Sequence, residues 1–378
     1  MSPHWFATHL ERGFSARITY LAVLLACVVI LAVSKPALAN SDVFEVTDVP
    51  VDATAESAAA ARESALAAGQ REAFARLLRR LTLRENHAVL PIPDANTVST
   101  YVRDFSVSDE KTSSVRYLAK MHVRFKSADI RALLTEFGLP FAETISKPIV
   151  IVPILEYNGA LMLWEDANRW RNAWLSQPAA SGLTPLVHPL GDITDIDTIG
   201  PRHAINGDRQ RLSQISKRYG TTSVVVTRAV LGSDVFSDLV SLDVYVTRYG
   251  MGDEPLTQVM TFSAPATDSV ETLLSNAALR TAEFIEDNWK QENLMRAGEQ
   301  GILAVAVPIS GLPNWLAVQQ RISGIAVIKQ MEIVLISRDE VRLNLHFMGD
   351  VRQLVTAFAQ ADLDLIQTEG GWNVTPLP

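Results

Sequence analysis

Carboxylates and a histidine gather in one short stretch of the chain, and metal chemistry is the chemistry they could perform. Asp192, Asp195 and Asp197 lie within six residues, and His188 precedes them. Closely spaced oxygen ligands on a loop can hold calcium or magnesium. The stretch lacks the EF-hand pattern, with no glycine at the sixth position and no glutamate at the twelfth, and two isoleucines interrupt the ligand alternation. Turn and cap chemistry is therefore favoured over a metal site.

Three tryptophans form a second candidate site, which would serve a partner. Trp164, Trp170 and Trp174 could line a groove for a peptide or a glycan, and Asn168 beside them could supply polar contacts. Trp170 and Trp174 stand one helical turn apart, a spacing that is more typical of packing into a core. The pattern therefore favours a core role, with a partner surface as the alternative.

Motifs for catalysis and for cofactors are missing from the sequence. It contains no Gly-x-Ser-x-Gly elbow, no Gly-x-Gly-x-x-Gly and no phosphate-loop glycines, and its histidines lack metal-ligand spacing. We therefore expect no cofactor and assign no catalytic residue. Because catalytic groups can converge from distant positions, this pattern weighs against an enzyme without excluding one.

An apolar run at Ile18–Val33 predicts export. Its sixteen residues follow Arg12 and Arg17. A membrane-spanning helix needs roughly 20 apolar residues, whereas the core of a signal peptide has about 7–15. Small side chains at Ala37 and Ala39 favour cleavage after Ala39. The alternative is an uncleaved inner-membrane anchor with its arginines in the cytoplasm.

Cleavage after Ala39 would set the composition of the mature chain. The only cysteine, Cys27, would leave with the leader, so no disulfide or thiolate site would remain. Three of the 34 basic residues and one of the 42 acidic residues would also leave, and 31 basic residues would then face 41 acidic ones. Such an acidic chain is not expected to bind nucleic acid. The bacterial periplasm is the predicted location.

Three compact units, at 40–146, 147–298 and 299–378, must position the candidate residues. In the first, a strand at 43–51 precedes a helix at 55–83, whose face of small residues would let it lie close to a sheet. Residues 115–126 alternate between apolar and basic side chains, which is typical of a half-buried strand. A short helix that starts at Ser127 completes a predicted β-α-β-β-α order.

The basic side chains of that alternating strand form a candidate anion-binding face. The neighbouring strand carries countercharge at Asp104 and at Asp109. A solvated outer face with cross-strand pairs is therefore the favoured interpretation.

The second and third units are also predicted to combine strands and helices, so the predicted fold class is α+β. Ile149–Leu155 is almost wholly apolar, as a strand buried on both faces would be. Asn158-Gly159 predicts a hairpin turn, and a later meander at 223–262 predicts a mixed α/β sandwich. Residues 299–378 have the β-α-β-β-α-β order of the ferredoxin-like plan. The leader at 1–39 would add a signal or anchor helix.

The tryptophan stretch at 163–174, with 189–192 and 217–220, is similar to the alphaproteobacterial branch of the domain of unknown function 2066 family. The helix end at 75–82 and the Gly-Leu-Pro sequence at 138–140 fit the same family. The resemblance covers most of the mature chain. It implies an exported envelope protein with no assigned activity, and it supplies no catalytic residues.

Three functional hypotheses follow. The first is a non-catalytic periplasmic binding or assembly module that contacts another envelope protein. The second is a metal-dependent hydrolase that uses His188, Asp192, Asp195 and Asp197. The third is a scaffold tethered to the inner membrane through an uncleaved segment at 18–33.

Overall fold

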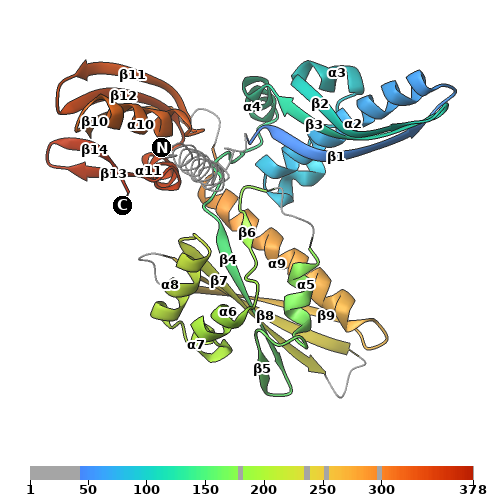
Figure 1. The fold of residues 1–378 in the computed structure, drawn as a ribbon. Helices are drawn as coiled ribbons and strands as arrows, with labels where there is room; N and C mark the ends of the chain where they lie inside the picture. The colour runs from blue at the N-terminus through green and yellow to red at the C-terminus, as the bar shows by residue number, and fades with distance from the viewer. Residues whose placement is uncertain (1–42, 178–181, 234–238, 251–254, 296–299, 378) are drawn as a thin grey trace, which may run out of the picture. The chain divides into compact units, whose positions relative to one another are not determined.

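The computed structural model describes residues 43–177, 182–233, 239–250, 255–295 and 300–377 (Figure 1). Helices and three sheets alternate along this part of the chain, which confirms the α+β class. The predicted leader, with Cys27, lies outside the described residues. None of the helices in the described ranges is both long enough and apolar enough to cross a membrane.

The first sheet is antiparallel and is covered by one long helix. Its strands lie in the order β1-β3-β2, with bounds β1 Glu45–Thr54, β2 Val102–Thr112 and β3 Arg116–Phe125. Helix α2 (Ala58–Leu81) begins at the N-cap Ser57. A Cβ added at Gly69 would lie 2.4 Å from the Met121 sulfur, so glycine permits the predicted close approach of helix and sheet. Helix α4 (Ser127–Glu136) follows β3.

Two short helices in this unit were not predicted from the sequence. They are the 3₁₀ helix η1 (Arg84–Val89) and α3 (Ala95–Tyr101). Asp94 starts α3 by accepting a hydrogen bond from the Thr97 N–H at 2.7 Å. Both helices lie in the connection between α2 and β2.

Ion pairs neutralise the basic face of β3. They are Arg116–Asp52, Lys120–Asp109 and Arg124–Asp104, at 2.6–2.8 Å. In each pair the hydrogen bond from the basic side chain is the main cause that lowers the pKa of the carboxyl group. The predicted countercharge is thus confirmed at Asp104 and Asp109, and the face is a solvated one.

The central sheet is covered on both faces. Its main order is β5-β4-β7-β8-β9, and β6 also pairs with β4. The strands are β4 Ile149–Tyr157, β5 Ala160–Met162, β6 Leu186–Val187, β7 Ser223–Ser233, β8 Leu239–Tyr249 and β9 Leu256–Pro265. Helices α5 (Arg169–Leu175) and α9 (Val270–Glu292) pack on one face, and α7 (Pro201–Ile205) and α8 (Arg209–Arg218) pack on the other.

Strand β4 lies between these two cores, as its apolar sequence predicted. Ile149, Ile151 and Leu155 belong to the core with α5 and α9. The intervening Val150 and Val152 belong to the core with α7 and α8. Alternate side chains of one strand therefore join the three layers of the sandwich.

The C-terminal unit keeps the predicted element order, and a last strand follows the turn at Gly370 and Gly371. Its elements are β10 Gln300–Pro308, α10 Leu312–Ser323, β11 Ile328–Ile336, β12 Glu340–Met348, α11 Val351–Gln360, β13 Leu363–Thr368 and β14 Gly371–Pro376. The sheet order is β11-β12-β10-β14-β13. In a ferredoxin-like sheet β13 would lie beside β10, but β14 occupies that place and runs parallel to β10. Gly371, with φ 117°, permits the tight reversal that puts β14 there.

Helix α9 contacts the first unit as well as the central sheet. Its Lys290 ammonium donates to the backbone oxygens of Arg79 and Thr82, at 3.1 and 3.0 Å. The Trp289 indole N–H donates to the Thr144 oxygen at 2.6 Å. Lys290 thereby satisfies carbonyl groups that α2 leaves unpaired at its C-terminal end.

Candidate interaction site

The stretch proposed as a metal site folds as a short capped helix, α6 (Ile193–Thr198). The Asp192 side chain accepts a hydrogen bond from the Asp195 backbone N–H at 3.0 Å. Aspartate is a preferred N-cap because it satisfies an amide that the helix leaves unpaired. This hydrogen bond is the main cause that lowers the pKa of the Asp192 carboxyl group. Asp192 therefore serves as the N-cap of α6.

Asp195 is fully buried and holds the loop that precedes α6. Its Oδ2 accepts hydrogen bonds from the Gly191 N–H at 2.8 Å and from the Tyr219 hydroxyl at 2.7 Å. The same hydroxyl accepts from the Leu190 N–H at 2.8 Å. Burial, followed by the bond to Asp195, raises the pKa of Tyr219, so its phenol keeps the proton that it donates. Gly191 has φ 75°, and a Cβ there would lie 2.9 Å from an Arg171 nitrogen.

Arg218 compensates the charge of both helix carboxylates. Its Nη2 donates to Asp192 Oδ2 at 2.6 Å, and its Nε lies 3.1 Å from Asp195 Oδ1. Asp197 is exposed, and no hydrogen bond or ion pair joins His188 to this cluster in the part of the chain that the structure describes. Within the ranges that the structure describes, no three His, Cys, Asp or Glu side chains are placed to hold a metal ion. The structure thus brings two of the four candidate ligands together, around a guanidinium.

His188 lies instead beside Trp174, with 5.9 Å between the ring centroids. Burial, followed by the nearby Arg171, lowers the pKa of His188, so its imidazole is neutral at pH 7. Ile151 and Pro153 help to line a small indentation at this place, which does not admit a water molecule. The indentation is too small to bind a ligand.

The helix tryptophans belong to the core. Trp170 and Trp174 are buried on the α5–α9 side of the central sheet and meet edge to face, with 5.8 Å between their ring centroids. The Trp170 indole N–H lies 3.1 Å from both the backbone oxygen and Oγ1 of Thr227. Trp164 is partly exposed and donates to the Ile199 oxygen at 2.7 Å. Burial of Trp170 and Trp174 agrees with the core role that their spacing favours, and it corrects the alternative that placed them on a partner surface.

Asn168 is also buried, and it joins α5 to the β4–β5 hairpin. Its Nδ2 lies 2.9–3.1 Å from the backbone oxygens of Pro153, Met162 and Leu163. Its Oδ1 accepts a hydrogen bond from the Arg171 N–H at 3.0 Å, which caps α5. The amide therefore satisfies backbone groups of three segments at once, and the prediction of a partner contact is corrected here too.

We expect Asn168→Ala to lower the free energy of unfolding by about 2–3 kcal/mol, because buried carbonyl groups and a helix N-terminus lose their partner. Asn168→Asp should cost more, since a carboxylate would face the oxygens of Pro153 and Leu163. Urea titration followed by circular dichroism measures both. Asn172→Ala is the control, because Asn172 is exposed and makes a single long bond of 3.4 Å. Equal losses at the two positions would contradict the role given to Asn168.

Three apolar side chains stand in solvent around the start of α6. Leu190, Ile193 and Ile196 are 73%, 76% and 51% exposed, and we call them the α6 patch. The loop that carries Leu190 is fixed, because Arg171 donates to the Leu190 oxygen at 2.6 Å while Tyr219 accepts from its N–H. A rigid backbone therefore displays apolar groups to solvent, as contact surfaces do.

Sequence reasoning missed the α6 patch although a signal was present. Ile193 and Ile196 were read as interruptions of a ligand pattern. On a helix of six residues, side chains at i and i+3 share one face, and the buried Asp195 occupies another. The two isoleucines lie on the face away from Asp195, and both are exposed.

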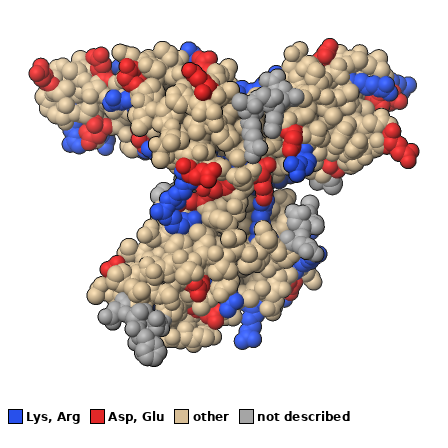
Figure 2. Space-filling view, turned by 180° about the vertical axis from the view of Figure 1, so that it is seen from behind, with Lys and Arg blue, Asp and Glu red and all other residues tan. Residues whose placement is uncertain are grey.

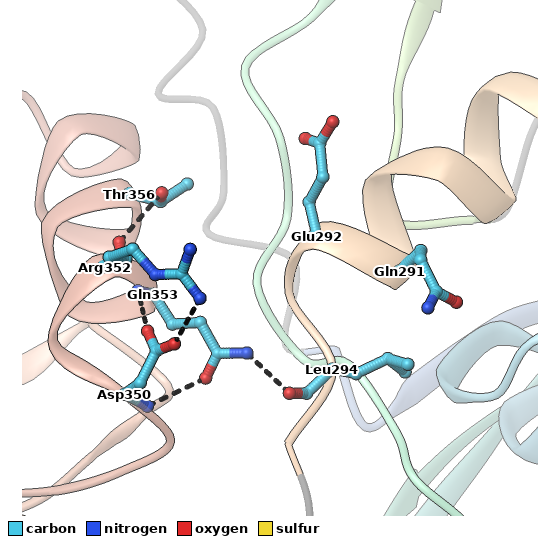
Figure 3. Close-up of a pocket in the computed structure, with 7 residues that line it drawn as sticks. All are labelled: Gln291, Glu292, Leu294, Asp350, Arg352, Gln353 and Thr356. Atoms are coloured by element: carbon cyan, nitrogen blue, oxygen red, sulfur yellow. Dashed lines mark hydrogen bonds and ion pairs between the residues drawn. The ribbon is translucent and has the colours of Figure 1, made fainter.

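A polar cavity of about 450 Å³ lies where the end of α9 meets the start of α11 (Figure 3). Gln353 Nε2 donates to the Leu294 oxygen at 2.5 Å, and its Oε1 accepts from the Asp350 N–H at 3.1 Å. The Asp350 carboxylate accepts from the Gln353 N–H at 2.8 Å in return. This capping box already pairs the Asp350 and Gln353 N–H groups at the start of α11. These groups are therefore not available to an anion in the cavity.

Charges of both signs are scattered over the surface. Figure 2 shows Lys and Arg interspersed with Asp and Glu on the face in view, without a broad basic area. That face therefore offers no basic track for a nucleic-acid backbone.

Comparison with known proteins corrects the family resemblance. The model of a family described as a domain of unknown function, DUF8605, matches residues 44–143, which hold β1 to α4. The resemblance to the DUF2066 family is therefore wrong. The segments at 163–174, 189–192 and 217–220 that carried it lie outside the matched residues.

No curated protein matches the chain. Among solved structures, the lipoprotein GNA1162 from Neisseria meningitidis is similar at 12% identity and a TM-score of 0.26. The match covers 37% of this chain and 97% of that one. A TM-score this low supports no conclusion about a shared fold or function.

Proposed function

We propose that this protein is exported to the bacterial cell envelope and acts there as a non-catalytic binding module that contacts a partner protein. The apolar run at 18–33 and the Ala37-x-Ala39 site support export. Release into the periplasm follows if Ala39 is the cleavage site. A retained leader would give the same body on the inner membrane.

The α6 patch is the observation that supports binding. Burial of apolar surface is favourable by about 25 cal/mol for each Å² removed from water, so a partner that covers these side chains would gain this free energy on binding. Arg218 and Asp192 lie beside the patch and would form part of a polar rim. The buried network of Asp195 and Tyr219 fixes the backbone, so binding would order few main-chain groups.

The competing hydrolase hypothesis receives no support from the geometry of its residues. Arg218 already compensates Asp192 and Asp195, and His188 lies against Trp174. A divalent cation would have to displace a guanidinium from a buried carboxylate. The binding module is therefore the function that we propose.

The mass of the mature protein tests export. Protein purified from the envelope fraction should begin at Asn40 if the leader is cleaved and at Met1 if it anchors the chain. Full-length protein that is recovered soluble from the cytosol with its leader intact would overturn the proposal.

We expect Ile193→Asp to abolish partner contact and to leave folding unchanged. Ile193 is largely exposed, so the free energy of unfolding should change by no more than about 0.5 kcal/mol. A carboxylate placed in an apolar contact costs about 2 kcal/mol or more, which would weaken binding at least about thirtyfold. The measurement is crosslinking in intact cells through Asp197→Cys, with Cys27→Ser in the background.

Leu256→Asp is the matched control for this test. Leu256 is a similarly exposed apolar residue on β9, an edge strand of the central sheet. Crosslinks to a defined neighbour should survive Leu256→Asp and disappear with Ile193→Asp. A crosslinking pattern that is identical in all three proteins would remove the α6 patch as the contact surface.

A further inference from the structure

A short segment with two prolines, Leu90–Pro93, connects η1 to α3, and we call it the proline segment. It belongs to no helix or strand. Ile92 in this segment is 95% exposed, more than any other large apolar side chain in the described ranges, and the preceding Val89 is 62% exposed. A single exposed isoleucine is common on protein surfaces, so the backbone that carries Ile92 decides what it can do.

The backbone of the proline segment is held in an extended form. The rings of Pro91 and Pro93 fix their own φ near about −65°, and each proline restricts the residue before it to β or polyproline II conformations. Leu90 has φ −63° and ψ 139°, close to the polyproline II values of about −75° and 145°. Each of the four residues is therefore constrained by its own ring or by the next one.

Both ends of the proline segment are anchored in the first unit. The Leu90 side chain packs against the core to which α2 and α3 contribute. Asp94, which follows the segment, accepts a hydrogen bond from the Thr97 N–H at 2.7 Å and starts α3. A segment that is already extended and anchored loses little conformational entropy when a partner binds it.

The carbonyl groups of the proline segment are unpaired. Within the residues that the structure describes, no hydrogen bond reaches the backbone oxygens of Leu90–Pro93. Partners of polyproline II segments use aromatic side chains, which stack on the proline rings and donate N–H or O–H groups to such oxygens. The proline segment therefore has the conformation and the free acceptors of a ligand for an aromatic groove.

Two other classes of occupant fit the proline segment less well. Addition to the edge of a sheet requires backbone N–H donors, which both prolines lack. An anionic lipid surface requires unpaired cations nearby. The segment lies between Glu85 and Asp94, which are both exposed, and Arg84 is paired with Glu283. These flanking charges would oppose contact with anionic lipid.

A second copy of this chain is also a poor fit. The exposed aromatic side chains Phe105, Phe137 and Tyr157 belong to β2, to the end of α4 and to β4, so they do not come from one element. The cavity beside α11 is polar, and the indentation beside Trp174 does not admit a water molecule. A different protein is therefore the expected occupant.

We propose that the proline segment is the ligand of an aromatic-lined groove on another protein, which binds Pro91, Ile92 and Pro93 in polyproline II form. The segment lies in the first unit, whereas the α6 patch lies in the central one. The inference thus goes beyond the proposed function and does not depend on the α6 patch.

Photocrosslinking in intact cells tests this inference on the full chain. A p-benzoylphenylalanine placed at the exposed Ala88 would lie close to the proline segment without altering it. Irradiation should give a discrete adduct with one protein, and the crosslinked peptide of that protein should contain or directly flank a cluster of Trp, Tyr or Phe. Ile92→Ser should lower the adduct yield at least about tenfold, because the contact loses a buried isoleucine. Leu256→Ser, at a similarly exposed apolar residue, is the matched control and should leave the yield unchanged.

Alanine at both prolines separates conformation from apolar contact. The double variant Pro91→Ala, Pro93→Ala keeps Ile92 but frees the backbone, so the adduct yield should fall about fivefold or more. Urea titration followed by circular dichroism checks folding, and Ile92→Ser should keep the native midpoint because its side chain is almost fully exposed. An adduct yield that is unchanged in the folded double variant would overturn the inference. Adducts with lipid or with a second copy, or no adduct that depends on Ile92, would overturn it as well.

Discussion

Trp170→Ala should lower the free energy of unfolding by about 3–5 kcal/mol, among the largest losses that a single substitution in this chain can produce. The indole is fully buried in the core between the central sheet and the α5–α9 layer, and it contacts Trp174 edge to face. Truncation would leave a cavity there. It would also remove the indole N–H that Thr227 accepts. Urea titration followed by circular dichroism measures the loss.

Trp170→Phe separates the packing contribution from the hydrogen bond. A phenyl ring keeps most of the apolar contacts, so the loss should fall to about 1–2 kcal/mol, of which the missing N–H donor accounts for about 1 kcal/mol. Trp164→Phe is a matched control on a partly exposed ring that also donates to a backbone oxygen. If Trp170→Ala were as stable as the native chain and lost only partner crosslinks, Trp170 would be a contact residue and not a core residue.

Local pattern predicted most of the elements, because the face that a strand or helix buries is encoded in its own sequence. The apolar run at Ile149–Leu155 predicted a strand buried on both faces, and β4 contributes alternate side chains to two cores. The alternation at 115–126 predicted β3 and its solvated basic side. Asp104 and Asp109 were correctly expected as countercharges because cross-strand neighbours follow from hairpin pairing.

Roles that depend on distant partners could not be predicted in the same way. Local spacing favours turn and cap chemistry for Asp192 and Asp195, but it does not identify the partners of these carboxylates, Arg218 and Tyr219, which lie more than twenty residues away. Asn168 is a candidate for polar contacts with a partner because it lies beside the tryptophans in the sequence. Its burial follows from three backbone oxygens that only the folded hairpin brings together.

The C-terminal sheet was predicted in element order and not in strand neighbours. Gly370 and Gly371 indicate a chain reversal after Thr368, but a reversal can place the last strand outside β13 or inside it. The structure puts β14 inside, parallel to β10, which local pattern does not encode. The same limit applies to β11, whose position at an edge is a property of the whole sheet.

Asp195→Ala should lower the free energy of unfolding by about 3–5 kcal/mol. Removing one partner of a buried ion pair leaves the other without compensation, and this costs far more than the net stability of the intact pair. Here the orphaned groups are the Arg218 guanidinium, the Tyr219 hydroxyl and the Gly191 N–H. Asp197→Ala is the matched control: it is the same change on the same helix, at an exposed carboxylate. It should alter stability by no more than about 0.5 kcal/mol.

Asp195→Asn extends the test from stability to the α6 patch. The amide keeps the size of the side chain and one oxygen for Gly191 or Tyr219, but it loses the charge that Arg218 compensates, so a loss of about 2 kcal/mol is expected. Because the network fixes the loop of Leu190, Asp195→Asn should also weaken partner crosslinking through Asp197→Cys, although no residue of the patch has changed. Unaltered crosslinking in a folded Asp195→Asn protein would mean that the network stabilises the helix without positioning the contact surface.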